Sequence, residues 1–523
     1  MKAQDYSISK DKFVFAQVEE EMHDKELETK PISYFKDAFN RFKRNKASIA
    51  AAIIIMILVL FSIIGPFCTP YKVSYSDSVY ARALPKNSWF EKTNFWDGCQ
   101  EWTTNEEQFY YFYSMGVETG HNALKNQKYE KISTLNNKGE KIVMYKFRLD
   151  SYQQQGVVFM NLTKEQYLSI QEYQDANNVQ IIYPYTDKSK RPTASQDIRN
   201  ANYWFKTQTV GGKSKAVLNA KGELTNIYRA NSGVNPKTGQ RWDGYYSKMR
   251  VEGETPKYDY AFENQTGYEV RVNYYEYYIY YNKAVLKDGI TKPSFLFGAT
   301  GTGQDIFVCL SSGARFSFIL AITVAIVNLF VGAIYGAIEG YYGGKLDLMM
   351  ERFVEILSAV PFMIVITLLK YHMQGSSQVL ILFIAFFLTG WIGMAGRTRM
   401  QFYRFKNQEY VLAARTLGAS DKRIMFKHIF PNALGTLITS CVLVIPGMIF
   451  SETSLSYLGI INLNSGNMTS VGTLLANAQS DLASFPHIML FPAVFICLLM
   501  LSFNLFGNGL RDAFNPSLRG SEY

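Results

Sequence analysis

Residues 48–68 read SIAAAIIIMILVLFSIIGPFC, and this stretch decides the fold class because it contains no charged side chain. An α-helix rises about 1.5 Å per residue, so about 20 apolar residues cross a hydrocarbon core that is roughly 30 Å thick. A cleaved signal peptide is the competing interpretation. It is disfavoured because the polar residues 1–47 come first, the apolar run is too long, and no small-residue cleavage site follows. We therefore predict that residues 48–68 form the first transmembrane helix.

Five further apolar stretches are each long enough to span a membrane. Several of them carry glycine and other small residues, which let helices approach closely in lipid. The sequence therefore predicts a polytopic α-helical membrane protein with six transmembrane helices, of which helices 2–6 lie within residues 298–509. The five stretches lie near residues 314–338, 354–371, 378–396, 433–457 and 487–509.

The charge distribution predicts the orientation in the membrane. The chain of 523 residues has a net charge of +10, which would also suit a nucleic-acid-binding protein. Its basic residues, however, crowd beside the apolar stretches, as they do in loops that stay in the cytoplasm. One such cluster, at residues 41–46, directly precedes the first span, whereas the loop between the fifth and sixth spans has no Lys or Arg. We therefore expect both termini to be cytoplasmic, and no nucleic-acid partner. The segments expected in the cytoplasm are residues 1–47, 339–353, 397–432 and 510–523.

Residues 70–297 separate the first two spans and are polar, charged and rich in Tyr and Asn. This orientation places them outside the cell, and their length is sufficient for a core of their own. Only Cys99 lies well inside this region, so no internal disulfide is expected. We predict a mixed α/β extracellular domain, whose aromatic residues either form its core or offer a docking surface. Strands are expected at 268–281, a helix at 163–176, an apolar run at 179–183, and loops at 210–215, 231–239 and 287–293.

Residues 409–432 read EYVLAARTLGASDKRIMFKHIFPN and predict two short helices with a joint. Ala413 and Ala414 favour the first helix, and Gly418 can adopt the left-handed conformation that ends it. Ser420 is a good N-cap for the second helix, which we expect Pro431 to stop. By this pattern alone, a surface hairpin lying on the membrane fits as well as a functional site does.

This segment resembles the EAA signature of ABC-importer permeases, in which small residues, a glycine and a later Ile and Pro build a helix that docks on the ATPase. Leu412 stands where the Glu of that signature would be. The resemblance implies that the loop couples the chain to a separate ATPase. The residues it assigns to that role are Glu409, Ala413, Ala414, Arg415, Gly418, Ala419, Ser420, Ile429 and Pro431.

Residues 32–71 and 295–516 are similar to the C-type permeases of oligopeptide and dipeptide importers. Thr300 and Gln304 depart from that pattern, because the family usually carries Asp and Arg there, so a surface ion pair is expected to be missing. The resemblance implies a type I ABC importer fold in a prokaryotic plasma membrane and a peptide substrate. Nickel importers have a similar permease, so nickel stays an alternative. The implied partners are a second permease subunit, two cytoplasmic ABC ATPase subunits and an extracellular substrate-binding lipoprotein.

The sequence offers little support for an enzyme or a cofactor site. Thr207 stands where a phosphate-binding loop ending in Gly212-Lys213-Ser214 needs Gly, so ATP is expected on partner subunits and no catalytic residue is predicted. The five histidines are scattered, which disfavours a metal site. A membrane-anchored extracellular sensor or adhesion protein remains the alternative from another class, although six spans are more than an anchor needs. No substrate-binding residue is assigned.

Three acidic residues lie within or beside the predicted spans, namely Glu339, Glu355 and Glu452. An ionisable residue inside a membrane is a candidate functional group by default. All three are expected near span ends, however, so their side chains could instead reach interfacial water.

Overall fold

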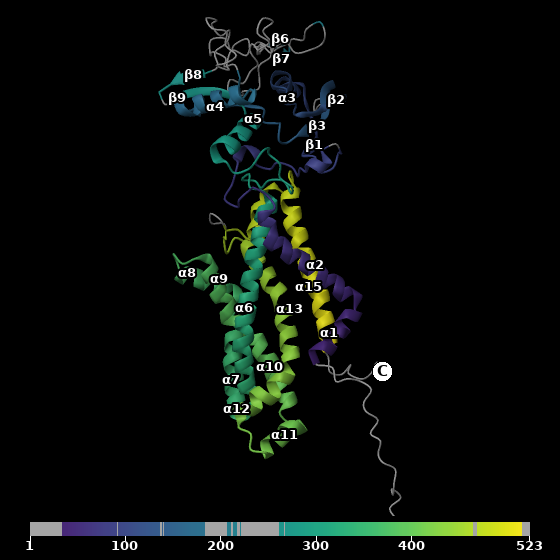
Figure 1. The fold of residues 1–523 in the computed structure, drawn as a ribbon, viewed down its shortest axis with the longest axis vertical. Coiled ribbons are helices and arrows are strands. Elements are labelled where there is room, and N and C mark those ends of the chain that lie inside the picture. Colours follow the sequence, from purple (N-terminus) through teal and green to yellow (C-terminus); the bar gives the residue numbers. More distant parts are fainter. Residues whose placement is uncertain are drawn as a thin grey trace, which may run out of the picture.

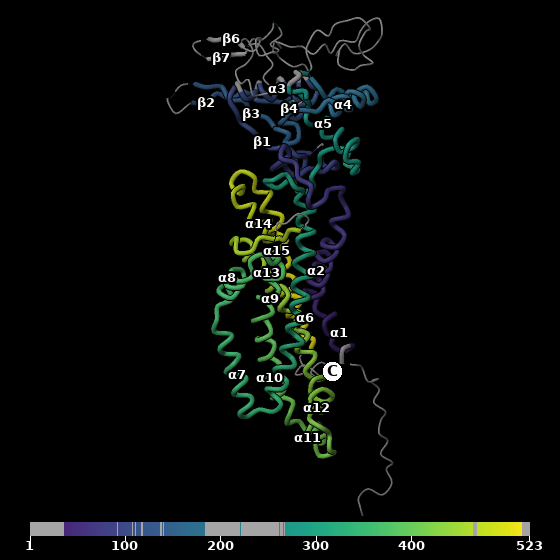
Figure 2. The backbone as a smooth tube through the Cα atoms, turned by 90° about the vertical axis from the view of Figure 1, so that its left-hand side faces the viewer, coloured from purple at the N-terminus to yellow at the C-terminus, as the bar shows by residue number. Residues whose placement is uncertain are grey.

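The computed structural model shows a long helical bundle with the described part of the inserted segment, residues 70–297, at one end and helices α11 and α12 at the other (Figure 1). A view turned by 90° shows the same order of parts along the long axis (Figure 2). The structure describes residues 34–514, apart from 92, 136–138, 140, 184–206, 211–212, 217–219, 221–260, 266 and 464–467.

Five helical stretches of the described chain are long and apolar enough to cross a membrane. The chain is therefore a multi-pass membrane protein. The prediction of six spans is met only if a sixth, bent pair of helices also counts as one span. The five stretches are Lys46–Phe67, Ile306–Tyr342, Gln378–Phe405, Asp421–Tyr457 and His487–Phe514.

The third span expected near 354–371 is a bent pair of helices in the structure. Helix α7 (Gly344–Ser358) and helix α8 (Phe362–His372) meet at an angle of 73°. Pro361 lies at the break and has no N–H to donate into a continuous helix, which explains why the chain turns there.

The remaining helices of the bundle follow the apolar pattern, with longer ends than expected. Helix α6 begins at Ile306 because Asp305 caps it, and it runs eight residues further toward the N-terminus than the stretch at 314–338. Asn45 caps α2 in the same way. The bounds are α1 Tyr34–Arg44, α2 Lys46–Ile64, α6 Ile306–Tyr342, α9 Gln378–Gly390, α10 Ile392–Phe405, α13 Phe430–Tyr457, α14 Val471–Ala478 and α15 His487–Phe514.

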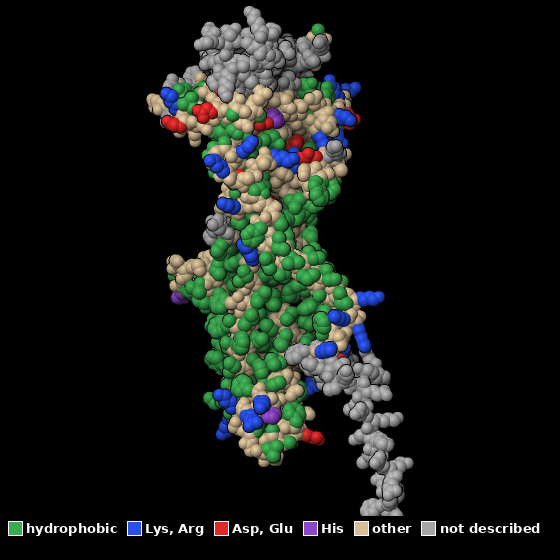
Figure 3. All heavy atoms as spheres, in the orientation of Figure 1, with side chains coloured by type: hydrophobic (Ala, Val, Ile, Leu, Met, Phe, Trp, Pro, Cys, Tyr) green, Lys and Arg blue, Asp and Glu red, His purple; other side chains and the backbone are tan. Residues whose placement is uncertain are grey.

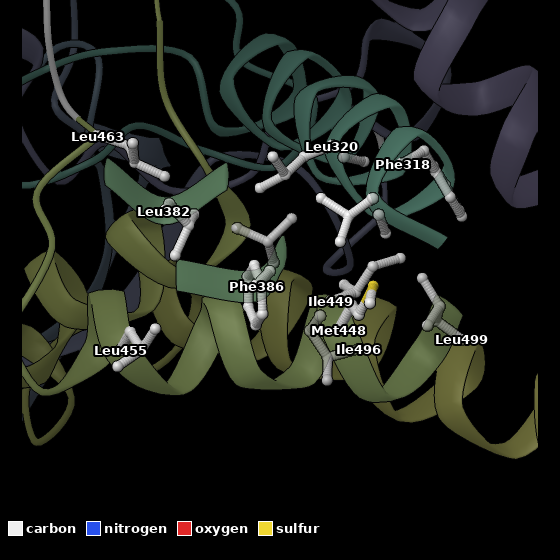
Figure 4. Packing of buried hydrophobic residues seen from close by; sticks show 14 of the residues in the cluster. Phe318, Leu320, Leu382, Phe386, Met448, Ile449, Leu455, Leu463, Ile496 and Leu499 are labelled. Carbon is white, nitrogen blue, oxygen red and sulfur yellow. The ribbon is translucent and has the colours of Figure 1, made fainter. Parts of the chain in front are cut away.

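Apolar side chains from several helices fill the core of the bundle, and Figure 4 labels some of them. Phe318 of α6 and Phe386 of α9 lie in the same buried cluster as Ile449 of α13 and Leu499 of α15. Because lipid is as apolar as this core, association of the helices depends on close packing. The closest packing joins α6 to α10, where a Cβ added to Gly336 would overlap the carbonyl oxygen of Ala395.

The described part of the inserted segment is a mixed α/β structure, as predicted. One sheet has the strand order β1-β3-β2, a second has β4-β9-β5 with β8 on β9, and β6 pairs with β7. All of these pairs are antiparallel. The strands are β1 Cys99–Asn105, β2 Leu124–Leu135, β3 Lys141–Asp150, β4 Val157–Leu162, β5 Ile182–Tyr183, β6 Thr207–Val210, β7 Lys213–Ala216, β8 Ala261–Asn264 and β9 Gly267–Asn273. The helices are α3 Glu106–Thr119, α4 Lys164–Asn177 and α5 Tyr274–Tyr280.

Only the first part of the strand predicted at 268–281 is a strand in the structure, and nearly all of the rest is helix α5. The strand ends at Asn273, whose side chain accepts a hydrogen bond from the N–H of Glu276 and so caps helix α5. The helix predicted at 163–176 is confirmed as α4, with Thr163 in a capping box. The predicted loop at 231–239 lies outside the described residues.

A cluster of buried aromatic residues joins the inserted segment to the bundle. Tyr71, Tyr80, Tyr278 and Phe295 of the inserted segment belong to one buried cluster with Val308 of α6. Next to this cluster, the N–H of Gln304 donates to Thr300 Oγ1 at 3.0 Å. Thr300 and Gln304 occupy the positions at which the family usually carries Asp and Arg. A neutral hydrogen bond therefore links these two positions in place of an ion pair.

The acidic residues of the spans differ in their surroundings. Glu355 is exposed and pairs with Arg352, as a residue that reaches the interface would. Glu339 and Glu452 are each only 1% exposed, so the expectation that both reach water was wrong. Hydroxyl donors satisfy Glu452, because Ser317 donates to it at 2.9 Å and Ser456 at 3.1 Å.

The surface of the bundle is largely apolar, with charged side chains gathered at its two ends (Figure 3). A wide apolar band between charged ends is the surface that a membrane-spanning protein requires.

Candidate coupling site

Helices α11 (Glu409–Thr416) and α12 (Asp421–Arg423) form the end of the bundle furthest from the inserted segment (Figure 1). Leu417 and Gly418 end the first helix, and Gly418 has a φ of +79°, the left-handed conformation that favours glycine. The N–H of Ala419 donates to the carbonyl of Ala414 at 3.1 Å, which completes a Schellman motif. The predicted joint at Gly418 is confirmed.

The second helix does not end where it was expected to end. After α12 the chain forms a π-helical turn, Ile424–Ile429, and continues directly into α13. Pro431 lies in the first turn of α13, where its missing N–H leaves no hydrogen bond unmade. Pro431 therefore lies within the helical stretch Asp421–Tyr457 instead of stopping a helix. Ser420 is at the N-cap position of α12, but its side chain makes no capping hydrogen bond.

The residues singled out in the sequence divide into two sets. Ala413, Arg415 and Gly418 are exposed, and so are Glu409, Ser420 and Pro431. Ile429 is fully buried, and Ala414 and Ala419 are half-buried. The structure thus places part of the set on a surface and part beneath it.

A buried apolar cluster fixes the two helices to the bundle. Val411 of α11 and Ile424, Met425 and Ile429 of the π-helical turn pack against Ala337, Tyr341 and Phe402. Ile429 thus supports the site from below. At the far side, the side-chain amide of Asn432 donates to the hydroxyl of Tyr410 at 3.3 Å, which links the start of α13 to α11.

Tyr341, near the end of α6, bridges the two short helices. Its hydroxyl donates to Asp421 Oδ1 at 2.6 Å and accepts a hydrogen bond from Arg415 Nη2 at 3.5 Å. The guanidinium group of Arg415 also lies 5.9 Å from the centre of the Tyr341 ring. Sequence reasoning missed Tyr341, because it is 80 positions from Asp421 and no local pattern relates them.

Large apolar side chains are exposed around the joint. Leu417 is 88% exposed, and Tyr410, Leu412 and Phe426 are each at least 40% exposed. Such a group of apolar side chains on a surface marks a protein or membrane contact. Within the described residues, no three side chains of His, Cys, Asp or Glu come together in a way that could hold a metal ion.

Comparison with known proteins identifies the family. Residues 329–520 match the binding-protein-dependent transport system inner membrane component, and residues 33–85 match the N-terminal transmembrane domain of oligopeptide transport permease C. The oligopeptide transport system permease protein OppC of Bacillus subtilis is 43% identical over 223 residues, which are 43% of this chain and 72% of that protein. The chain belongs to the family of binding-protein-dependent transport permeases.

Other members of this permease family are similar over the same share of the chain. OppC of Haemophilus influenzae is 40% identical over 43% of this chain and 70% of its own, and the dipeptide transport permease DppC of Bacillus subtilis is 38% identical over 43% and 69%. An inward-facing structure of the MetNI methionine ABC transporter matches with a TM-score of 0.29 and 13% identity, over 38% of this chain and 94% of that chain. The coupling site lies within the part of the chain that matches the permease family.

Proposed function

We propose that this chain is the membrane-spanning subunit of an ABC importer that takes up oligopeptides or dipeptides. The observation that carries the proposal is its 43% identity to an oligopeptide permease over most of that protein's length. The names of the relatives favour peptides over nickel, the alternative left open by the sequence. ATP hydrolysis is assigned to separate subunits, so this chain is a transport subunit without its own ATPase site or cofactor.

The orientation follows from charge. The basic residues that flank the spans support a cytoplasmic position for both termini and the coupling site, and an extracellular position for residues 70–297. The proposed fold is that of a type I importer, with residues 298–509 as the permease core. A second permease subunit, two ABC ATPase subunits and a substrate-binding lipoprotein complete the proposed transporter in a prokaryotic plasma membrane. In this proposal the inserted segment meets the lipoprotein.

The coupling site suits contact with an ATPase because it exposes apolar side chains to solvent and its buried residues hold it firmly against the bundle. Leu417, beside the joint, extends into solvent, whereas Ile429 anchors the π-helical turn in the core. A short helix that lays apolar side chains into a groove is a common mode of protein recognition. We assign this contact to Glu409, Ala413, Ala414, Arg415, Gly418, Ala419 and Ser420, with Ile429 and Pro431 as positioning residues.

Tyr341 connects the coupling site to α6, a helix long enough to cross the membrane. Since its hydroxyl contacts Arg415 and Asp421 together, a movement of the two short helices acts directly on the end of α6. Closure of the ATPase pair would thereby be passed to the spans.

The test is purification of the chain with its candidate ATPase and permease partners, comparing wild type with Gly418→Pro and Ala414→Arg. Gly418→Asn is the matched control, because Asn tolerates the left-handed conformation and a Cβ at this position meets no atom within 4 Å. We expect the first two variants to enter the membrane but to lose the ATPase or transport-coupled hydrolysis, and the Asn variant to keep both. Unchanged binding and turnover in all variants would instead favour the membrane-anchored sensor.

A further inference from the structure

A polar cavity of about 350 Å³ lies between helices α10, α13 and α15. Three arginines line it, Arg397 and Arg404 from α10 and Arg511 from the last turn of α15. The positions 397, 401 and 404 recur at helical spacing, so one face of α10 supplies Arg397, Gln401 and Arg404 together. The role proposed above does not account for this cavity.

The three guanidinium groups have no acidic partner among the described residues. None of them forms an ion pair with a carboxylate in the part of the chain that the structure describes. Like charges that share a cavity repel one another, and a planar guanidinium is the side chain best suited to bind phosphate in a bidentate manner. The cavity therefore has the chemistry of an anion site.

The rest of the lining fits a phosphate group that carries further polar atoms. Thr436 and Ser440 of α13 bring hydroxyl groups to the cavity. Gln401 Oε1 is buried without a hydrogen-bond partner among the described residues, so it can accept a hydrogen bond from a ligand. Leu443 and Phe514 add apolar surface to the same cavity.

The position of the cavity indicates a lipid. Phe514 lines the cavity and also packs with Phe42 of α1, whose ring lies 5.3 Å from that of Phe506. Helix α1 ends in basic residues, buries its apolar face on α15 and leads straight into the first span. An amphipathic helix in this place lies at the level of the lipid headgroups.

We propose that this cavity binds the headgroup of an anionic phospholipid at the end of the bundle where α1 lies. Arg397, Arg404 and Arg511 hold the phosphate, Gln401 accepts a hydrogen bond from the headgroup, and Leu443 and Phe514 contact the start of the acyl chains. Basic cavities between transmembrane helices on the cytoplasmic side bind such headgroups in other membrane proteins. The proposal rests on the proposed orientation only for the choice of leaflet.

The test uses the complete transporter in nanodiscs of phosphatidylcholine with increasing phosphatidylglycerol. Bound phosphatidylglycerol is counted by native mass spectrometry, and the melting temperature is recorded in parallel. Each arginine near an anionic group contributes about fivefold in binding, so single Arg→Gln variants should lose about fivefold in apparent affinity. The triple variant R397Q/R404Q/R511Q should lose more than tenfold by the same reasoning.

Two further variants test whether a loss of lipid binding has another cause, namely misfolding of the chain or a general loss of positive charge. The triple Arg→Lys variant keeps the charge but loses the bidentate geometry, so its binding is expected to lie between that of the wild type and that of the triple Arg→Gln variant. A charge-matched control, K345Q/R352Q/R423Q, removes three cations that do not line the cavity and is expected to bind like wild type.

Three results would overturn the proposal. The first is equal loss of phosphatidylglycerol in the triple variant and the charge-matched control. The second is equal stabilisation of the wild type by inorganic phosphate in pure phosphatidylcholine, which would assign the cavity to a soluble anion. The third is a triple variant that keeps the lipid but releases the second permease subunit, or that no longer discriminates peptides with a free from those with an amidated C-terminus. The lipid count and the melting temperature do not depend on the coupling to ATP hydrolysis that tests the proposed function.

Discussion

The Nε–H of Arg82 donates to Asp481 Oδ1 at 2.8 Å, although the two residues are 399 positions apart. Arg82 follows the first span, and Asp481 lies in the segment that leads into the last one. This ion pair therefore ties the base of the inserted segment to the far end of the permease sequence. The two sides are unequal, since the side chain of Arg82 is 43% exposed and that of Asp481 only 8%.

Loss of Arg82 should cost more than loss of Asp481. Arg82→Gln leaves a buried carboxylate without its partner, and we expect the free energy of unfolding to fall by about 2 kcal/mol. Asp481→Asn leaves only a half-exposed guanidinium, so a loss of about 1 kcal/mol is expected. Thermal unfolding in detergent measures both. Lys292→Gln is the control, because its pair with Glu91 is exposed on both sides. If Arg82→Gln were no more harmful than that control, the ion pair would not hold the two parts together.

Arg399 should be required because it is the common ion-pair partner of three carboxylates. It lies 2.7 Å from Asp347, 3.1 Å from Glu351 and 3.4 Å from the buried Glu339. Arg399→Gln leaves Glu339 unpaired inside the bundle, at an expected cost of about 3 kcal/mol or more. The double variant with Glu339→Gln should recover part of this loss, as a double-mutant cycle on the melting temperature will show. Additive losses in the cycle would mean that the two side chains act independently.

Gly336 should tolerate no side chain. A Cβ at this position would overlap the backbone of Ala395, so Gly336→Val must separate α6 from α10. We expect loss of the folded peak in size-exclusion chromatography. Gly393→Val, on α10 itself, is the matched control, because a Cβ at Gly393 has no atom within 4 Å. Equal behaviour of the two variants would contradict the close approach of the helices.

Cys68 and Cys99 should differ in their reaction with maleimide. Burial, with Asp150 and Asp97 nearby, raises the pKa of the Cys99 thiol to about 12, so the reactive thiolate is scarce near neutral pH. Cys68 is exposed just after the first span. A membrane-impermeant maleimide added to whole cells is expected to label the Cys99→Ser variant, which keeps Cys68. It is expected not to label the Cys68→Ser variant, which keeps Cys99. Labelling of Cys68 only after the cells are opened would reverse the proposed orientation.

Local chemistry made part of this structure predictable. The joint at Gly418 depends on one residue that adopts a left-handed conformation, and helix α4 depends on a capping box within four residues. Apolar length located the spans, because lipid imposes that length on any helix that crosses it.

Contacts between distant residues decided the rest. Pro361 is visible in the sequence, but Pro446 and Pro492 lie inside α13 and α15 without ending them, so a proline alone did not predict the break. The burial of Glu452 depends on Ser317, which is 135 positions away. The role of Tyr341 in the coupling site likewise depends on a tertiary contact, with Asp421, and no spacing pattern in the sequence predicts that contact.

Helix α6 has 37 residues without a break in its helical assignment, from the cap at Asp305 to the contact of Tyr341 with the coupling site. At about 1.5 Å per residue this is a rod of roughly 55 Å, much longer than the hydrocarbon core is thick. A rod has no soft joint in which a displacement could be absorbed. A tilt of about 5° at the coupling end would shift the opposite end by roughly 5 Å over this length, which is about one helical turn. The base of the inserted segment is seated on that opposite end, so it should move in step with events on the other side of the membrane.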